Sequence, residues 1–145
     1  MSGSDPYNLQ RFVDAQSAVI DTALSELRAG SKHSHWMWFI FPQLAELGRS
    51  PTAKFYGIRC FGEARAYFDH PVLGDRLRLC VGDLNAWANR RTAEQILVTV
   101  DSKKLRSSLT LFDLVVPRCI FSDALLNFFG GERDEHTLAL LAGEQ

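Results

Sequence analysis

The chain has 145 residues, 46% of them hydrophobic, which is the size and composition of one globular domain with a substantial core. Its 16 basic and 17 acidic residues leave a formal net charge of -1. No overall positive field therefore attracts nucleic acid or an anionic membrane, and we expect neither as a partner. Cys60, Cys80 and Cys119 form no CxxC pair, which favours reduced thiols over a disulfide framework or a zinc site.

The first ten residues, MSGSDPYNLQ, contain neither the basic nor the apolar part of a signal peptide. No apolar run approaches the roughly 18 to 20 residues of a membrane span. We therefore expect a cytoplasmic protein. Residues 1–4 are small and polar and are predicted to be disordered, residues 5–142 to form one helical domain, and residues 143–145 to fray.

One helical element, with a possible break near Ser17, is expected before residue 31. Asp5 and Pro6 offer a cap and a first-turn proline, so a helix or helical turn is predicted to begin there. Apolar side chains then recur at helical spacing on one face, with a break near Ser17. Gly30 stands where a left-handed residue would close this element.

Residues 31–43, SKHSHWMWFIFPQ, are too aromatic for a surface loop and carry too many polar groups for a passive core. Both faces of residues 36–41 are apolar, so periodicity does not separate helix from strand. We favour a buried helix that ends before Pro42. The segment is interpreted as the central wall of the domain and of a pocket.

The middle of the chain predicts three helices. Ser50 and Pro51 form a cap and a first-turn proline for a short helix that reaches Ile58. A second helix ends at His70, because the residue before a proline is forced out of the α region. The third, from about 71 to 88, is the strongest. Its buried seam consists of Leu73, Leu77, Cys80, Leu84 and Trp87.

The last third predicts four more helices. Residues 92–95 form a capping box, and Asp101 is expected to cap the following helix, which ends before Pro117. A helix with an apolar seam that includes Leu126 stops at the two glycines after residue 129, and Asp134 caps the last one. Alternation of period two is absent. The prediction is a mainly α fold, a single compact domain of seven or eight short helices with little or no β. The expected core contains Phe12, Leu24, Phe39, Leu77, Leu84, Leu109, Phe112 and Leu125.

Five motifs, taken in this order, resemble the bacterial family called domain of unknown function 1810. They are DPYNLQRFVDAQ, KHSHWMWFIFPQ with the following LGRSP, EARAYFDHPVLGDRL, DSKKLRSSLTLF and FFGGERDEHTLALL. The resemblance covers about Asp5 to Leu141 and implies a mainly helical single domain without an assigned activity. Some members are labelled calpastatin, but such inhibitor repeats are disordered and poor in aromatics, whereas this chain has ten Phe, three Trp and three Tyr. A fainter likeness, in helical architecture and an aromatic pocket, is to the NADAR family linked to NAD and ADP-ribose processing.

Seven residues are candidates for a ligand-binding site: His35, Trp36, Trp38, Gln43, Tyr56, Lys104 and Ser108. His33 and His35 are spaced to bind a metal only on a strand and have no third ligand at a recognisable spacing, so no metal is expected. For the others, two roles stay open. His35 either bonds within the core or lines a pocket, the tryptophans either pack or stack on a ligand, and Gln43 binds either a ligand or the backbone.

Lys104 and Ser108 lie one helical turn apart, so the lysine could act as the base for the hydroxyl, although this spacing is common on solvated helices. Four further residues are candidates for a general acid or base: Glu63, His70, Asp101 and Asp134. Helix caps explain both aspartates equally well, and a turn before proline explains His70. Whether the protein is an enzyme is left open.

Three functions are compatible with these residues. The first is a small-molecule pocket, with hydrolysis of an N-glycosidic bond in a nucleotide or ADP-ribose derivative, in which Lys32 or Lys104 meets phosphate. The second is a non-catalytic module that binds a protein, and the third, nucleic-acid binding, is disfavoured by the charge. We expect no cofactor and make no prediction of oligomeric state. For the pocket, at least two of five residues should line one cavity. They are His35, Trp38, Gln43, Tyr56 and Lys104.

Overall fold

The computed structural model describes residues 5–143, and over this range the chain forms ten α-helices and one 3-10 helix. Seven of the α-helices have at least eight residues, and α3, α4 and α7 are shorter, so residues 5–143 contain more helices than the seven or eight predicted. Residues 5–143 contain no β-strand, only an isolated parallel bridge between Leu44 and Ile58. The mainly α prediction is confirmed. Residues 1–4 and 144–145, where loose ends were predicted, lie outside the described range.

The first two helices are separated at the break expected near Ser17. The carboxylate of Asp5 accepts hydrogen bonds from the backbone N–H of Leu9 (2.8 Å) and Gln10 (3.0 Å), and these bonds lower the pKa of Asp5. Asp5 therefore acts as a cap, although α1 (Gln10–Ser17) begins several residues after it. α2 (Ile20–Ala29) ends at Gly30, whose φ of 72° is left-handed.

The aromatic segment forms α3 (Met37–Ile40), a buried turn of helix that ends before Pro42 as predicted. The 3-10 helix η1 (Ala45–Leu47) leads to α4 (Pro51–Phe55), where Ser50 Oγ accepts from the N–H of Ala53 at 3.0 Å. Ile58 was predicted to belong to this helix and does not. Its N–H donates instead to the carbonyl of Gln43 at 2.8 Å, which ties it to the chain before η1.

His70 joins the next two helices. α5 (Phe61–Asp69) ends at His70 as the following proline predicts. His70 Nδ1 then accepts from the backbone N–H of Val72 (3.1 Å) and Leu73 (3.2 Å), at the start of α6 (Leu73–Asn85). The His70 side chain, predicted only to be part of a turn before proline, thus also accepts hydrogen bonds from two backbone N–H groups at the start of α6.

Two of the last four helices begin as the sequence predicts. Thr92 and Gln95 form the capping box of α7 (Ala93–Leu97), and Asp134 caps α10 (Glu135–Ala142). Asp101 does not cap α8 (Thr99–Val115), because the helix starts two residues before it. α9 (Ile120–Phe129) ends at the left-handed Gly130, but Leu126, placed in its buried seam, is 66% exposed.

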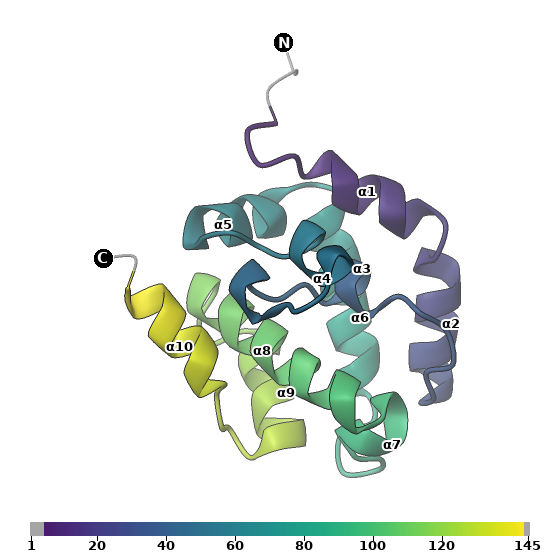
Figure 1. Ribbon diagram of the computed structural model, residues 1–145. Helices are drawn as coiled ribbons and strands as arrows, with labels where there is room; N and C mark the ends of the chain where they lie inside the picture. The colour runs from purple at the N-terminus through teal and green to yellow at the C-terminus, as the bar shows by residue number, and fades with distance from the viewer. Residues whose placement is uncertain (1–4, 144–145) are drawn as a thin grey trace.

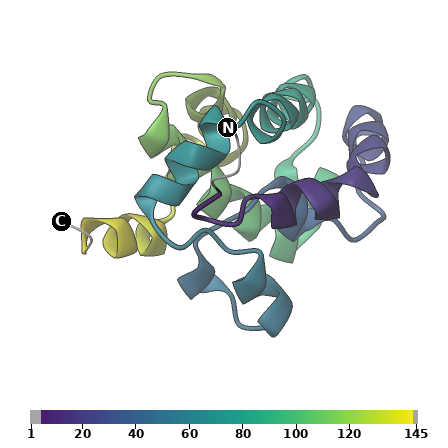
Figure 2. The same ribbon diagram turned by 90° about the horizontal axis from the view of Figure 1, so that it is seen from above.

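α6 and α8 are central to the arrangement. α8 packs against α5, α7, α9 and α10, and α6 packs against α2, α5 and α9. The two ribbon views place α2 and α10 at opposite ends of the molecule (Figures 1 and 2). Six of the eight predicted core residues are buried, and Leu24 and Phe39 are half-buried and pack against the same core. None of the helices in residues 5–143 combines the length and the apolarity needed to cross a membrane.

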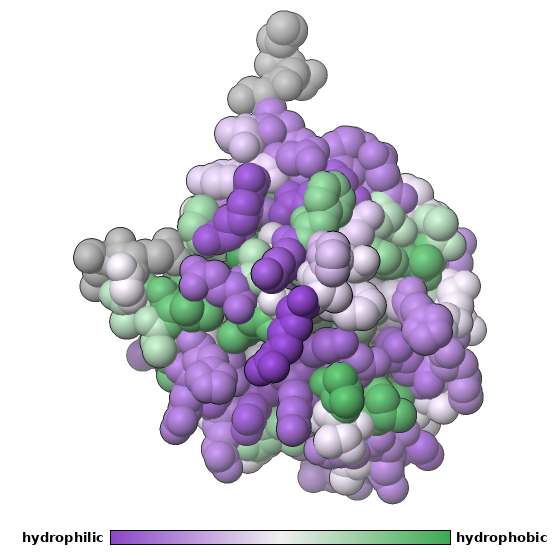
Figure 3. Space-filling view, viewed as in Figure 1, coloured by the Kyte–Doolittle hydropathy of each residue, from purple (hydrophilic) through white to green (hydrophobic). Residues whose placement is uncertain are grey.

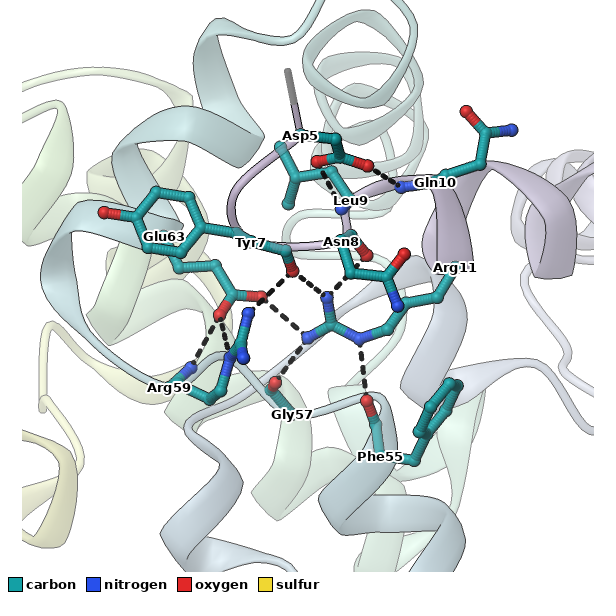
Figure 4. A network of polar contacts seen from close by, with 10 residues as sticks. All are labelled: Asp5, Tyr7, Asn8, Leu9, Gln10, Arg11, Phe55, Gly57, Arg59 and Glu63. Carbon is teal, nitrogen blue, oxygen red and sulfur yellow. Dashed lines mark hydrogen bonds and ion pairs between the residues drawn. The ribbon is translucent and has the colours of Figure 1, made fainter. Parts of the chain in front are cut away.

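A buried ion-pair network joins the region around α1 to that around α5 (Figure 4). Arg11 Nη2 lies 2.7 Å from Glu63 Oε2, and their side chains are only 6% and 0% exposed. The other donors of Arg11 bond to four backbone carbonyls, those of Tyr7, Asn8, Phe55 and Gly57. Arg59 Nε donates to the second oxygen of Glu63 at 2.9 Å. Glu63, a candidate acid or base, is therefore enclosed by partners.

Candidate ligand-binding cleft

A cleft of about 610 Å³ lies between the chain around residues 38–50 and the helices α8 and α10. α3 supplies Trp38 to its wall, and Gln43 and residues 47–50 continue the same side. α8 and the start of α10 form the other side. The α8 residues are Val100, Lys103, Lys104, Arg106 and Ser107, and the α10 region contributes Asp134 and His136. Figure 3 shows that hydrophilic side chains predominate on the face seen in the view of Figure 1, where α8 and α10 lie.

Helical spacing explains the α8 side of the cleft. Val100, Lys103, Lys104 and Ser107 follow one another at i, i+3, i+4 and i+7, so they share one face of the helix. The opposite face, with Leu105, Leu109 and Phe112, is buried in the core. A single amphipathic helix thereby supplies both core and cleft.

Trp38 is the aromatic wall of the cleft. It is half-buried, and Lys104 Nζ lies 4.2 Å from the centre of its ring, in cation–π contact. Its indole Nε1 is cut off from solvent and has no hydrogen-bond partner among residues 5–143. The indole nitrogens of Trp36 and Trp87 differ, because each donates at 2.9 Å, to Glu26 and to the Leu27 carbonyl respectively.

Gln43 is a second polar group without a partner in this wall. It is 8% exposed and lines the cleft, and its side-chain amide forms no hydrogen bond to any of residues 5–143. The backbone carbonyl of Gln43 accepts from Ile58, which fixes the position of the residue. Buried amides are normally bonded, so an amide left free beside an open cleft is available to a ligand.

Asp101 forms ion pairs with two lysines, Lys32 and Lys104. Its carboxylate oxygens lie 3.0 Å from Lys32 Nζ and 3.4 Å from Lys104 Nζ. Lys32 Nζ also lies 5.1 Å from the ring centre of Trp36 and is not a lining residue of the cleft. These ion pairs correct two expectations. Asp101 pairs with lysines and does not cap α8, and Lys32 is paired with Asp101 and does not line the cleft.

The remaining charges of the cleft are mostly positive. Arg49, Lys103 and Arg106 form no ion pair with any residue that the structure describes. Asp134 is the lining carboxylate, and its Oδ2 accepts from the N–H (3.0 Å) and Oγ1 (2.6 Å) of Thr137. A surplus of positive charge thus faces a local opening in a protein of net charge -1.

Three of the seven candidate residues, Trp38, Gln43 and Lys104, line this cleft. The other four lie elsewhere: Trp36 is fully buried, Tyr56 packs edge-on against Phe39 at 4.7 Å, Ser108 is 1% exposed, and His35 is exposed. His35 is therefore neither a core histidine nor a lining residue. Ser108 forms no hydrogen bond with Lys104, so the structure does not assemble the proposed nucleophile and base. Ligand binding itself stays a prediction.

Glu26 explains why His35 is outside. Its carboxylate accepts from the N–H groups of His33 (2.9 Å) and Ser34 (3.0 Å), from Ser34 Oγ (2.6 Å) and from the Trp36 indole. Burial acts to raise the pKa of Glu26, but these hydrogen bonds outweigh it and lower the pKa to about 2. The carboxylate holds the loop before α3 in a shape that turns Trp36 inward and leaves His35 in solvent.

No group of three His, Cys, Asp or Glu side chains within residues 5–143 is arranged to hold a metal ion. His33 Nε2 lies 3.2 Å from Ser31 Oγ, in a local contact. Cys60, Cys80 and Cys119 are free thiols, and burial raises the pKa of Cys80 to about 12.

Nine lining residues were not among the candidates, and six of them are polar or charged: Arg49, Ser50, Lys103, Arg106, Ser107 and His136. The i, i+3, i+4, i+7 face of α8 was readable from the sequence and would have found Lys103 and Ser107 once Lys104 was chosen. Arg49 and His136 carry no such local signal, because tertiary packing alone brings them to α8.

Comparison with known proteins places this architecture in a family. The sequence model of a protein family described as protein of unknown function (DUF1810) matches residues 6–141. The chain belongs to this family. The DUF1810 chain is also similar to a solved structure, the conserved hypothetical protein Rv1873 from Mycobacterium tuberculosis, with 47% identity and a TM-score of 0.92. That match covers 95% of this chain and 99% of the other. The comparison with curated proteins gives no match.

Proposed function

We propose that the cleft between α3 and α8 binds a small molecule with a planar group, which packs against Trp38 and bonds to Gln43. The observation that carries the proposal is the combination, in one wall of the cleft, of the half-buried Trp38 ring and the Gln43 amide, which forms no hydrogen bond to residues 5–143. An amide without a protein partner that lines an open cleft can donate to and accept from a ligand, and an aromatic ring beside it can stack on a planar group. A volume of about 610 Å³ is within the usual range for small-molecule sites.

Lys104 restricts how the planar group is bound. Its ammonium occupies one face of the Trp38 ring at 4.2 Å. A ligand ring either stacks on the other face or displaces Lys104 from a contact that is held by Asp101 at 3.4 Å. In the first arrangement Lys104 keeps its place over the Trp38 ring, and in the second its side chain moves away from the ring.

Binding has better support than hydrolysis. Cleavage of an N-glycosidic bond would use a carboxylate beside the oxocarbenium-like centre. Asp134 is the carboxylate among the lining residues, and one of its oxygens caps α10 through Thr137. A nucleotide or ADP-ribose derivative fits the proposal as a ligand, and we propose no catalytic residue.

The alternative, a protein-binding module that uses the aromatic segment, has weaker support. Trp36 is fully buried, Phe39 is half-buried against the core, and Lys104 covers part of Trp38. A partner protein would find little of the aromatic surface available.

The test compares ligand affinity with thermal stability. AMP and adenosine are titrated into the wild type, Gln43→Ala and Trp38→Ala by isothermal titration calorimetry, and the melting temperature of each protein is measured. We expect both substitutions to weaken AMP binding by about tenfold or more, the loss of one or two good contacts, with a smaller effect on melting. His35→Ala is the matched control, because it lies in the same segment but is exposed outside the cleft. Failure of the wild type to bind either compound, or equal losses in all three variants, would contradict the proposal.

A further inference from the structure

We infer that the cleft contains a phosphate subsite formed by Arg49, Lys103 and Arg106, so that its ligand is a phosphate ester rather than a neutral planar molecule. The inference rests on the proposed function and deepens it by naming the class of ligand. The three cations come from both walls of the cleft, Arg49 from the stretch before α4 and the other two from α8.

Three cations that form no ion pair with a described residue line this one cleft. Lys54, Arg90 and Arg118 also form no ion pair with a described residue, but they do not line it. Arg28, Arg65 and Arg78 each pair with an aspartate at about 3 Å on the surface. The cleft cations have no such partner within residues 5–143, although they lie together. Positive charges in excess of the one lining carboxylate repel one another, and an anion bound among them reduces that repulsion.

The chemistry of the wall fits phosphate. Arginine offers a planar fork of donors that matches phosphate oxygens, and lysine adds a compact charge. Ser50 Oγ accepts from the N–H of Ala53, which leaves its own proton free to donate into the cleft. His136, on the side formed by α8 and α10, is a further polar group that lines the cleft. Several donors in one cleft suit a group with several oxygens and two negative charges better than a single carboxylate.

The cleft also separates the two ends of such a ligand. Trp38 and Gln43 are the planar and hydrogen-bonding wall, whereas Arg49, Lys103 and Arg106 provide the charge. Lys104 contributes to both parts. Its ammonium lies over the Trp38 ring, and the residue follows Lys103 in the sequence. A nucleoside monophosphate has the same division between a flat base and a charged end.

The test uses three compounds and two double variants in calorimetry at low salt. Adenosine carries only the planar part, inorganic pyrophosphate only the charge, and AMP both. Arg49→Gln with Lys103→Gln removes two cations from the subsite. Arg90→Gln with Arg118→Gln removes two exposed cations that do not line the cleft, and is the matched control for net charge.

We expect AMP to bind at least about tenfold more tightly than adenosine, the effect of one charge-assisted contact. Pyrophosphate should bind by itself and weaken severalfold as salt is raised. The cleft double variant should lose the advantage of AMP and the binding of pyrophosphate, and the control should keep both.

The outcomes separate the two proposals. Equal affinity for AMP and adenosine, or an unchanged cleft double variant, overturns the phosphate subsite and leaves the planar site standing. Pyrophosphate binding that the cleft variant abolishes, without binding of AMP or adenosine, supports the subsite and overturns the proposed function. Absence of binding by all three compounds overturns both.

Discussion

Arginine is used in opposite ways at two places in this molecule. At the junction of α1 and α5, Arg11 bonds to four backbone carbonyls and to Glu63, and Arg59 shares the same carboxylate (Figure 4). In the cleft beside α8, Arg49 and Arg106 have no ion pair with a described residue. The first group is closed and the second is open toward solvent.

The difference separates residues that build the fold from residues available to a ligand. Glu63 was a candidate acid or base from its residue type alone, but its partners and its complete burial make it part of the framework. Arg49 was not a candidate, yet it is free and lies in a cleft. Substitutions should therefore affect stability at the first place and binding at the second.

The largest expected effect is at the closed network. Glu63→Gln leaves the buried guanidinium of Arg11 without its counter-charge, and breaking a buried pair from one side costs about 3 to 5 kcal/mol. Urea unfolding measures the loss. Asp69→Asn is the control, because Asp69 and Arg65 are both 56% exposed and such pairs contribute about 0 to 1 kcal/mol. Equal effects of the two substitutions would show that the network is not a structural element.

A substitution in the apolar core provides a reference value for the stability that Glu63→Gln is expected to lose. Leu77 is 2% exposed in the α6 seam, and Leu77→Ala should lower the free energy of unfolding by about 2 to 5 kcal/mol through lost burial and a residual cavity. The same urea experiment measures it. A loss below about 1 kcal/mol would show that the seam is packed differently.

Glu26 tests an intermediate case, a carboxylate with several partners in a loop. Its pKa is lowered from 4.5 to about 2, so it stabilises the fold above pH 4.5, and this contribution is lost as the pH falls toward 2. After allowance for solvent screening we expect about 1 to 2 kcal/mol. Unfolding free energies at pH 6 and pH 3 should differ less in Glu26→Gln than in the wild type. An identical pH dependence in both proteins would contradict the role given to this carboxylate.

The smallest effect on stability is expected in the cleft. Arg49→Gln and Lys103→Gln remove charges that make no ion pair with a described residue, so each should change the unfolding free energy by no more than about 0.5 kcal/mol. Thermal or urea unfolding measures this in the absence of ligand. A loss of stability similar to that of Glu63→Gln would show that Arg49 and Lys103 stabilise the fold, and would contradict the distinction between the Glu63 network and the cleft.

Local signals explain what the sequence predicted well. Ser50, Thr92 and Asp134 cap helices through backbone groups three residues away, and Gly30 ends a helix through its own backbone. Such features depend on short stretches of chain, so residue type and spacing reveal them. The mainly α fold follows from the same signals.

Distant partners explain what the sequence predicted poorly. Asp101 has a residue type that suits a cap, but its partner is Lys32, on a loop far away in the chain. His35 has a residue type that suits a pocket, but Glu26 on α2 holds its loop so that the ring faces solvent. Arg49 and His136 meet across the cleft only after α10 packs on α8.

The most direct test of ligand binding follows the indole N–H signals in ¹H–¹⁵N spectra during titration with AMP. Trp36 and Trp87 have bonded indoles, and Trp38 does not, so Trp38→Phe assigns its signal by loss. A ligand in the cleft should shift the Trp38 signal in a saturable manner and leave that of Trp87 unchanged. Saturable binding of AMP with no change at Trp38, or no binding at all, would contradict the account.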